Sequence, residues 1–229
     1  MTDFKRLVFL TLAASALLSG APAAAQAPTG LFNTLEIPSS NLTALPQWQH
    51  VRQGFAPLAK RARLCDQDIQ ECKSQQMTLW RTKIQELEHA EDMVKLRQIN
   101  GFINKWQKAS DQDIYQQKDY WATPLEFIIN GGDSEDFAIM KYVSLKELGI
   151  SPDAMRIVVT NDVLRGVTHT ILTVKLNTKT YILDSQNNTV LEQEFVKYYV
   201  PFYSVNETTR WAHIPQQISS LGDAAGTKK

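Results

Sequence analysis

The sequence lacks an excess of charge of either sign. Its 24 lysines and arginines balance 24 aspartates and glutamates, so the net charge is zero with histidine neutral. A protein whose main partner is nucleic acid usually carries a basic surface, so this balance argues against such a partner. The 43% of hydrophobic and 21% of charged residues are ordinary for a globular protein and exclude disorder throughout the chain.

Long hydrophobic runs are also scarce. The apolar run at residues 7–18 is too short to span a bilayer well, and no later segment resembles a membrane helix. Two basic residues precede this run and three alanines at 23–25 follow it, which is the pattern of a secretory signal peptide. We therefore predict a signal peptide at residues 1–25 and an exported mature protein. Its loss removes two basic residues and one acidic residue, leaving 22 against 23 and a net charge of about −1.

Cysteine is rare, since Cys65 and Cys72 are the only two in 229 residues. Export makes a disulfide the default state for such a pair. On one continuous helix these residues would be two turns apart, about 10 Å, which is beyond disulfide reach. A bridge therefore needs a turn between them, near residues 66–68. We predict this bridge; two free thiols are the alternative.

Hydrophobic periodicity divides the chain into two parts. Spacings of three and four residues predict helices at 44–63, with a kink at Pro57, and at 77–87, 96–106 and 134–148. Segments rich in valine, isoleucine, threonine and tyrosine predict strands at 155–160, 167–176, 180–184 and 198–203. Helices first and strands second indicate an α+β fold with a central helix on an antiparallel sheet. We expect a helical lobe at 26–149, a sheet lobe at 150–214 and a disordered tail at 215–229.

The densest local signals lie in residues 119–142, which contain two helix starts. Thr123, Pro124 and Glu126 form a capping box with proline at the first helical position. A glycine pair ends that short helix, and Asp133 then caps a second one that begins at Ser134. The amides and dipole of a helix N-terminus favour a thiolate or an oxyanion. An ordinary acidic first turn is the alternative interpretation.

The same helix start concentrates negative charge. Three carboxylates fall within four residues, at Asp133, Glu135 and Asp136, and a hard cation with oxygen ligands would relieve their repulsion. The spacing does not match the loop of an EF-hand, so the sequence signal for calcium is weak by itself. Calcium prefers six to eight oxygens, so a polar group from the loop 109–120 should add to the shell. A solvated acidic turn is the alternative.

One histidine can be placed beside an aspartate by counting along a predicted hairpin. With a two-residue loop at 177–178, Ile171 pairs with Asp184, and His169 shares the face of Ile171. The carboxylate is then a diagonal neighbour of the imidazole, within about 7 Å between backbones. A three-residue loop without a bulge would place them on opposite faces. We expect both side chains on the sheet face towards Ser134.

These segments together resemble the bacterial transglutaminase-like cysteine proteinases of the LapG type. The resemblance lies in residues 119–149, in GVTHTILTV around His169 and in YILD ending at Asp184. The helix of Trp48 and the region of Asn100 are similar too, so the resemblance covers most of the chain after residue 25. Asn100 and Asn104 lie one turn apart, where a site or ordinary surface chemistry would both fit.

The resemblance implies a papain-like or transglutaminase-like fold and a periplasmic, calcium-dependent endopeptidase. Such enzymes clip large surface adhesins and are held by an inner-membrane receptor that responds to cyclic di-GMP. It also implies the residue roles. By motif position, the nucleophile, general base and orienting acid would be Ser134, His169 and Asp184, and the calcium carboxylates would be Asp133, Glu135 and Asp136.

Position 134 departs from the family pattern, which has cysteine there. A hydroxyl ionises at far higher pH than a thiol, so the change should cost much of the rate. The chain is then, in our order of preference, an inactivated form of a cysteine enzyme, a natural variant that binds without cutting, or a weak serine hydrolase. Two further functions stay open: a non-catalytic binding homologue, and acyl transfer to an amine as in transglutaminases.

Overall fold

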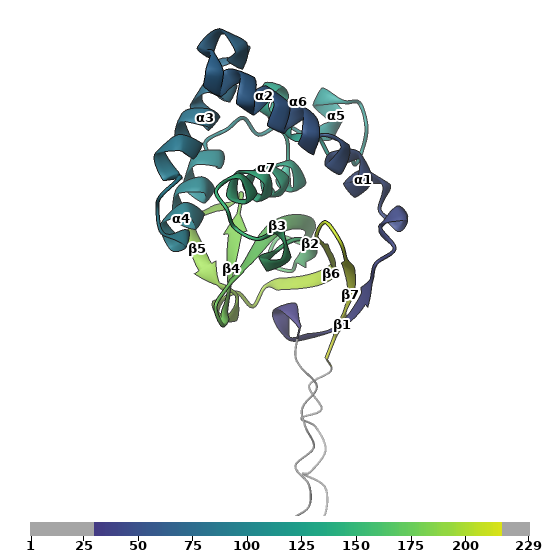
Figure 1. Cartoon of the computed structure of the whole chain (residues 1–229). Coiled ribbons are helices and arrows are strands. Elements are labelled where there is room, and N and C mark those ends of the chain that lie inside the picture. Colours follow the sequence, from purple (N-terminus) through teal and green to yellow (C-terminus); the bar gives the residue numbers. More distant parts are fainter. Residues whose placement is uncertain (1–29, 217–229) are drawn as a thin grey trace, which may run out of the picture.

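The computed structural model describes residues 30–216 (Figure 1). The expected signal peptide at 1–25 lies outside this range. Of the expected tail at 215–229 only residues 215–216 are described, and Pro215 is the last residue of a strand, because it pairs with Thr34. Within residues 30–216 no helix is both long enough and apolar enough to cross a membrane.

The helices occupy the first two thirds of the described chain, as the hydrophobic spacing predicts. They are α1 (Pro46–Gln53), α2 (Phe55–Gln67), α3 (Gln75–Leu87), α4 (Asp92–Ile103), α5 (Asp111–Ile114), α6 (Pro124–Asn130) and α7 (Ser134–Glu147). The break expected at Pro57 falls instead at Gly54, between α1 and α2. Pro57 lies in the first turn of α2, where backbone amides have no partner within the helix and a proline is tolerated.

The strands form one antiparallel sheet with the order β1-β7-β6-β2-β3-β4-β5. They are β1 (Thr34–Ser39), β2 (Met155–Asp162), β3 (Val167–Leu176), β4 (Lys179–Asp184), β5 (Asn187–Glu192), β6 (Tyr199–Val205) and β7 (Arg210–Pro215). The four predicted strands are present, whereas β1, β5 and β7 were not predicted. Strand β1 pairs with β7, Thr34 opposite Pro215, so it depends on a partner from the other end of the chain.

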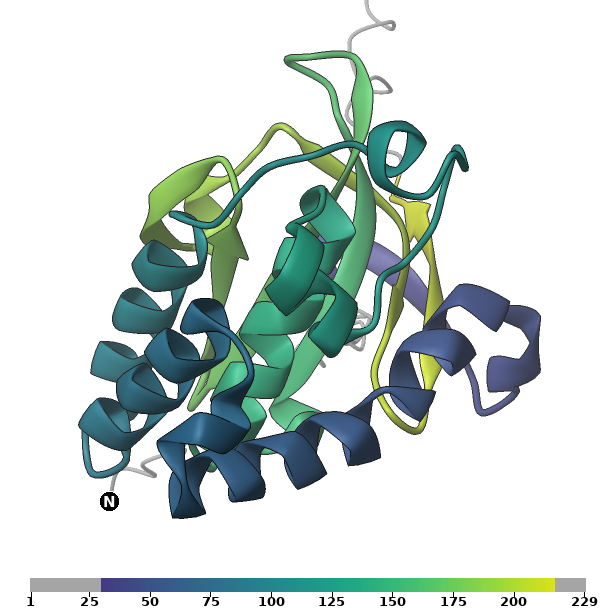
Figure 2. The same cartoon turned by 90° about the horizontal axis from the view of Figure 1, so that it is seen from above.

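Helix α7 is the centre of the core. It lies between the sheet and the outer helices in Figure 1, and the blue helices border it in the view of Figure 2. Every residue from Glu135 to Leu145 on this helix is buried. The main hydrophobic cluster joins α7 to one face of the sheet, through Val159, Leu172 and Leu183. The fold is therefore the α+β arrangement of helices on an antiparallel sheet that the sequence predicts.

A disulfide joins Cys65 to Cys72, as predicted. Cys65 lies in the last turns of α2, which ends at Gln67, and Cys72 closes a short 3₁₀ turn at Ile69–Cys72. The chain reverses between them, so the two Cα atoms are 4.3 Å apart. A continuous helix has no such turn and would have held the two cysteines too far apart for a disulfide.

Candidate active site and acidic cluster

Capping boxes begin the two helices α6 and α7, and α7 carries position 134. The Thr123 hydroxyl caps α6 while Glu126 accepts from the Thr123 amide, and Asp133 and Asp136 form the same reciprocal pair at the start of α7. Both helix starts follow the sequence prediction. Ser134 is the first residue of α7, so its hydroxyl lies at the positive end of the helix dipole.

The Ser134 hydroxyl lies against strand β3. Its Oγ accepts a hydrogen bond of 3.1 Å from the Thr170 amide and donates one of 3.1 Å to Glu135 Oε2. The pairing of β3 with β4 ends at Leu172 and Leu183, so the Thr170 amide lies beyond the paired part of the two strands. Among the described residues no hydrogen bond joins Ser134 to His169, which is the neighbour of Thr170 in the chain.

His169 and Asp184 form a buried pair. The two-residue hairpin loop predicted at 177–178 is present, with Leu176 opposite Lys179. Histidine Nε2 lies 2.8 Å from Asp184 Oδ1, and the two residues are 3% and 5% exposed. The two side chains therefore share one face of the sheet, as the hairpin count predicts.

The face itself is not the expected one. Residues alternate along β3, so His169 lies with Ile171, which belongs to a small cluster apart from α7. Thr170 and Leu172 lie on the other face, and Leu172 packs in the main core with α7. Ser134 therefore contacts the backbone of β3 at Thr170, next to His169 in the chain and beyond the end of the β3–β4 ladder.

Asp184 is held as a carboxylate by several donors. The Tyr199 hydroxyl donates to Oδ2 at 2.6 Å, and the Gln186 amide donates to Oδ1 at 2.9 Å. Burial alone would raise the pKa of Asp184, but the hydrogen bonds from His169, Tyr199 and Gln186 outweigh it and lower the pKa to about 2. An ionised Asp184 accepts the Nε2 proton of His169, which leaves Nδ1 as the basic nitrogen.

The side chain of Gln186 approaches that basic nitrogen. Its Nε2 atom lies 3.4 Å from His169 Nδ1, at the limit of a hydrogen bond. Gln186 thus contacts both members of the pair, Asp184 with its main chain and His169 with its side chain. Neither Gln186 nor Tyr199 lies in a motif that is recognisable from the sequence, so neither was predicted.

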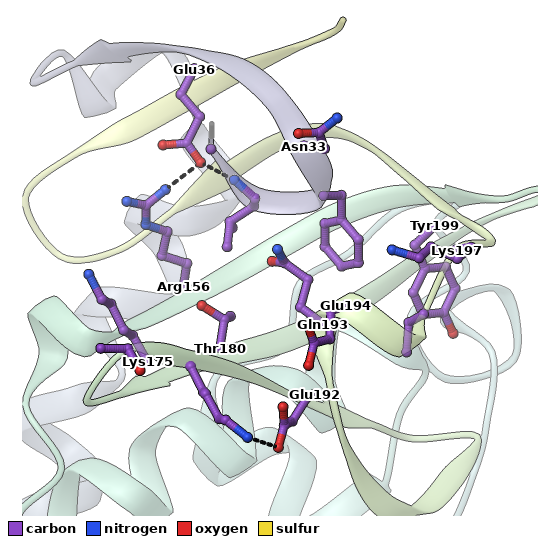
Figure 3. Close-up of a pocket in the computed structure, with 16 residues that line it drawn as sticks. Asn33, Glu36, Arg156, Lys175, Thr180, Glu192, Gln193, Glu194, Lys197 and Tyr199 are labelled. Atoms are coloured by element: carbon purple, nitrogen blue, oxygen red, sulfur yellow. Dashed lines mark hydrogen bonds and ion pairs between the residues drawn. The ribbon is translucent and has the colours of Figure 1, made fainter. Parts of the chain in front are cut away.

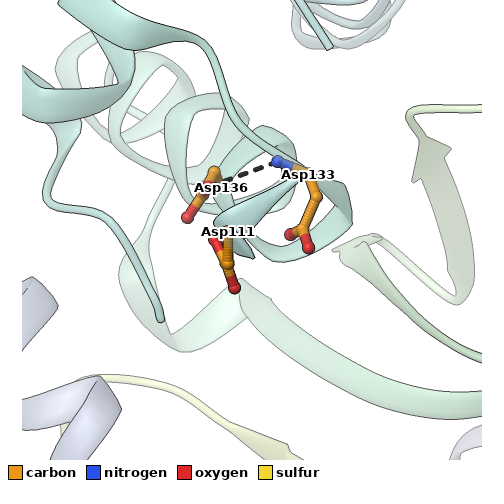
Figure 4. A group of neighbouring side chains, drawn as sticks. All are labelled: Asp111, Asp133 and Asp136. Atoms are coloured by element: carbon orange, nitrogen blue, oxygen red, sulfur yellow. Dashed lines mark hydrogen bonds between the residues drawn. The ribbon is translucent and has the colours of Figure 1, made fainter. Parts of the chain in front are cut away.

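A cluster of acidic side chains lies beside the start of α7 (Figure 4). Asp111, Asp133 and Asp136 each offer a carboxylate oxygen, and these oxygens lie within 4.8 Å of one another. Asp111 was not among the individual residues predicted as metal ligands. It lies in the loop 109–120 from which we expected a further metal ligand.

The third predicted carboxylate belongs to a second group. Glu135 offers an oxygen within the same 4.8 Å of oxygens from Asp111 and Asp119. Burial raises the pKa of Glu135, and the charges of Asp133 and Asp136 act in the same direction. Asp111 is common to both groups, so it connects the loop 109–120 to the start of α7.

The donor set fits a hard cation. The Oδ1 atoms of Asp111 and Asp133 are buried and have no hydrogen-bond partner among the described residues. Burial and the charges of Asp133 and Asp111 raise the pKa of Asp136 to about 8, despite donated bonds from the Ala122 and Asp133 amides. Buried carboxylate oxygens with no donor are the ligands that calcium prefers, so this cluster could bind a metal ion.

A cavity of about 850 Å³, drawn in Figure 3, has none of the residues of the acidic cluster in its lining. Its lining comes from residues 30–36, Arg156, the β3–β4 hairpin and residues 192–199, and two ion pairs join charged side chains of this lining. Arg156 binds Glu36 at 2.9 Å and Lys179 binds Glu192 at 2.7 Å. Tyr199 lines this cavity and also contacts the histidine and aspartate pair.

Comparison with known families decides the classification. Residues 52–219 match the model of the bacterial transglutaminase-like cysteine proteinases. The chain belongs to this family. Comparison with curated proteins found no match.

Solved structures of a family member support the same classification. The structure of Legionella pneumophila LapG is 28% identical over 68% of this chain and 87% of its own, with a TM-score of 0.58. Calcium-bound Legionella pneumophila LapG is 28% identical over 72% of this chain and 92% of its own, with a TM-score of 0.60. A transglutaminase-like cysteine proteinase fold therefore carries the His169 and Asp184 pair of this chain.

Proposed function

We propose that this chain is an exported, periplasmic endopeptidase scaffold of the LapG type, with serine in place of the catalytic cysteine. The observation that carries the proposal is the buried His169 and Asp184 pair next to the strand amide that binds Ser134 Oγ. The substrate would be a large cell-surface adhesin, cleaved in the control of biofilms. An inner-membrane receptor for cyclic di-GMP would hold the protease.

The residues have the chemistry for acyl transfer. In the proposed reaction the side chain at position 134 attacks the carbonyl carbon of the scissile peptide bond. Substrate binding would bring this side chain within hydrogen-bond distance of His169 Nδ1, which takes its proton. The imidazolium, stabilised by Asp184, then gives that proton to the leaving amine, and an ester or thioester to residue 134 is formed. Water, deprotonated by the same imidazole, hydrolyses this acyl-enzyme. A serine hydroxyl is the weaker nucleophile in this sequence, because a thiol ionises near neutral pH.

Calcium is the proposed cofactor, and the calcium-bound Legionella LapG supports it. Asp111, Asp133 and Asp136 would hold the ion, with Glu135 and Asp119 nearby. Bound calcium would supply positive charge that offsets the repulsion among these carboxylates. Asp111, Asp133 and Asp136 would then keep the loop 109–120 close to the start of α7, next to position 134.

The Ser134→Cys variant tests the proposal. With calcium present we expect it to cleave the adhesin of the source bacterium, and we expect a thiol-alkylating inhibitor to abolish the cleavage. The matched control is Ser134→Cys combined with His169→Gln, which keeps the thiol and removes the base. Absence of cleavage by the calcium-loaded Ser134→Cys protein would refute the enzyme assignment.

A non-catalytic binding homologue is the second candidate. It is favoured by the hydrogen bond of the Ser134 hydroxyl to Glu135, since a nucleophile ready for attack would donate to the imidazole instead. In that case the Ser134 protein binds the adhesin, and the Ser134→Cys variant binds it equally well without cutting. Binding followed by cleavage in the variant distinguishes the first candidate from the second.

A further inference from the structure

Three side chains at four-residue intervals all donate to the same short turn. Asn100 and Asn104 lie on α4 and at its end, and Lys108 follows four residues later. We define the Asp184 turn as residues 184–188, which connect β4 to the start of β5. Asn100 Nδ2 donates to the carbonyl oxygen of Asn187 at 2.8 Å, and Asn104 Nδ2 donates to that of Asp184 at 2.9 Å.

Lys108 completes this set of contacts. Its ammonium group donates to the carbonyl oxygen of Ser185 at 2.9 Å. The register of β4 with β5 shifts between Ile182 and Asp184, and Asp184 pairs with Asn187 at the turn itself. Side-chain donors from α4 and its extension therefore add hydrogen bonds to the carbonyl groups of this short, irregular end of the ladder.

The Asp184 turn carries the groups that hold the imidazole. Asp184 Oδ1 lies 2.8 Å from His169 Nε2, while the carbonyl oxygen of the same residue accepts from Asn104. Gln186, two residues later, lies 3.4 Å from His169 Nδ1. The position of the turn therefore sets the positions of Asp184 and Gln186, the two residues whose side chains lie within hydrogen-bond distance of the imidazole nitrogens.

The backbone on either side of Lys108 contacts the glycine pair that precedes α7. The Gly132 amide donates to the Gln107 carbonyl oxygen at 3.2 Å, and the Ala109 amide donates to the Gly132 carbonyl oxygen at 3.0 Å. Gly131 has a φ of +73°, and a Cβ there would lie 2.2 Å from the Gln107 carbonyl oxygen. Glycine is thus required for this close approach, which ends two residues before Ser134.

We propose that residues 100–109, the bridging segment, set the distance between position 134 and the imidazole of His169. Asn104 and Lys108 are then positioning residues for the reaction: their side chains fix the Asp184 turn while the backbone next to Lys108 fixes the approach to α7. The inference rests on the proposed function, since it assigns these residues to the same site. It adds a third element to a site otherwise built from α7 and the sheet.

The first measurement uses the Ser134→Cys protein, in which Cys65 and Cys72 remain bridged and unreactive. Alkylation of the introduced thiol by iodoacetamide, followed against pH, reports thiolate formation. An ordinary thiol has a pKa of about 8.5, and pairing with a histidine lowers it. We expect Asn104→Ala to slow alkylation about tenfold at pH values below the pKa of the introduced thiol. At high pH, where the thiol is ionised in both proteins, we expect little change. Asn104 is uncharged, so the slower alkylation cannot result from the loss of a charge.

Matched variants separate positioning from general damage. Gln98→Ala removes an exposed amide from the same helix and should leave the alkylation profile unchanged. Lys108→Met removes the donor to Ser185, whereas Lys108→Arg keeps a donor and should restore most of the rate. If Asn104→Ala does not fold, the Lys108 pair decides the question. An equal profile for Asn104→Ala and Gln98→Ala overturns the inference.

A second measurement does not depend on catalysis. The imidazole NMR signal of His169 in the Ser134 protein should move in Asn104→Ala and stay in Gln98→Ala. If the thiol of the Ser134→Cys parent titrates like an ordinary thiol, the proposed function fails, and this signal still decides the bridging segment. An unchanged His169 signal in Asn104→Ala then overturns the inference.

Discussion

Neutralising one carboxylate of the acidic cluster should change stability in opposite directions with and without calcium. Asp111→Asn is the sharpest change, because Asp111 is 3% exposed and its Oδ1 has no partner, while its Oδ2 accepts from the Tyr120 amide at 2.7 Å. An asparagine oxygen can keep the Tyr120 bond. Its amide group can donate to the Asp133 oxygen that has no hydrogen-bond partner. The substitution also removes the charge repulsion between these two side chains.

The two magnitudes follow from these contacts. A buried acceptor without a partner costs about 1–3 kcal/mol, so Asp111→Asn should stabilise the calcium-free protein by about 1 kcal/mol. In a domain of this size that corresponds to a rise in Tm of about 2–4 °C. An ion bound at about 100 times its Kd adds about 2.7 kcal/mol to the parent, which is a rise of about 5–10 °C.

The assay is thermal unfolding of the Ser134 protein and two variants, in EGTA and in about 10 mM calcium, which is about 100 times a Kd of about 10⁻⁴ M. The parent should gain stability with calcium, and Asp111→Asn should lose that gain. Asp113→Asn, an exposed change in the same short helix, should respond like the parent. Magnesium should stabilise the parent less, because it requires tighter octahedral geometry. A parent Tm unaffected by calcium, or an equal gain in Asp111→Asn, would contradict the metal site.

Two further predictions concern the scaffold. Cys65→Ser with Cys72→Ser should lower stability by about 2–3 kcal/mol, since the bridge closes a loop of roughly eight residues in the unfolded chain; an unchanged Tm would show that the bridge adds no stability. Lys141 is fully buried, its ammonium has no partner among the described residues, and burial lowers its pKa to about 7. The unfolded lysine titrates near 10.4, so the unfolded state binds more protons between about pH 7 and 10, and stability should rise with pH across that window. Lys141→Met should therefore raise the Tm more at pH 6 than at pH 10, measured against the parent at each pH, and an equal rise would contradict the buried charge.

Local signals in the sequence account for much of the site. The capping boxes at Thr123 and Asp133 use residues three positions apart, so the pattern alone locates both helix starts. The loop at 177–178 fixes the register of β3 with β4, and with it the shared face of His169 and Asp184. The roles of Ser134, His169 and Asp184 in catalysis stay a prediction until activity is measured.

The sequence by itself determined what depends on neighbours along the chain: the helices, the hairpin, the disulfide across a turn and the α+β order of elements. Only the tertiary structure decided what depends on distant partners. Strand β1 forms because β7 lies beside it, and Asp111 joins Asp133 because the loop 109–120 folds back onto α7. Asn104 follows Asn100 by one helical turn in the sequence, and it acquires a role only where the Asp184 turn presents a carbonyl oxygen to it. Periodicity and capping act over a few residues, whereas such contacts depend on how the packed elements place groups 80 residues apart within hydrogen-bond distance.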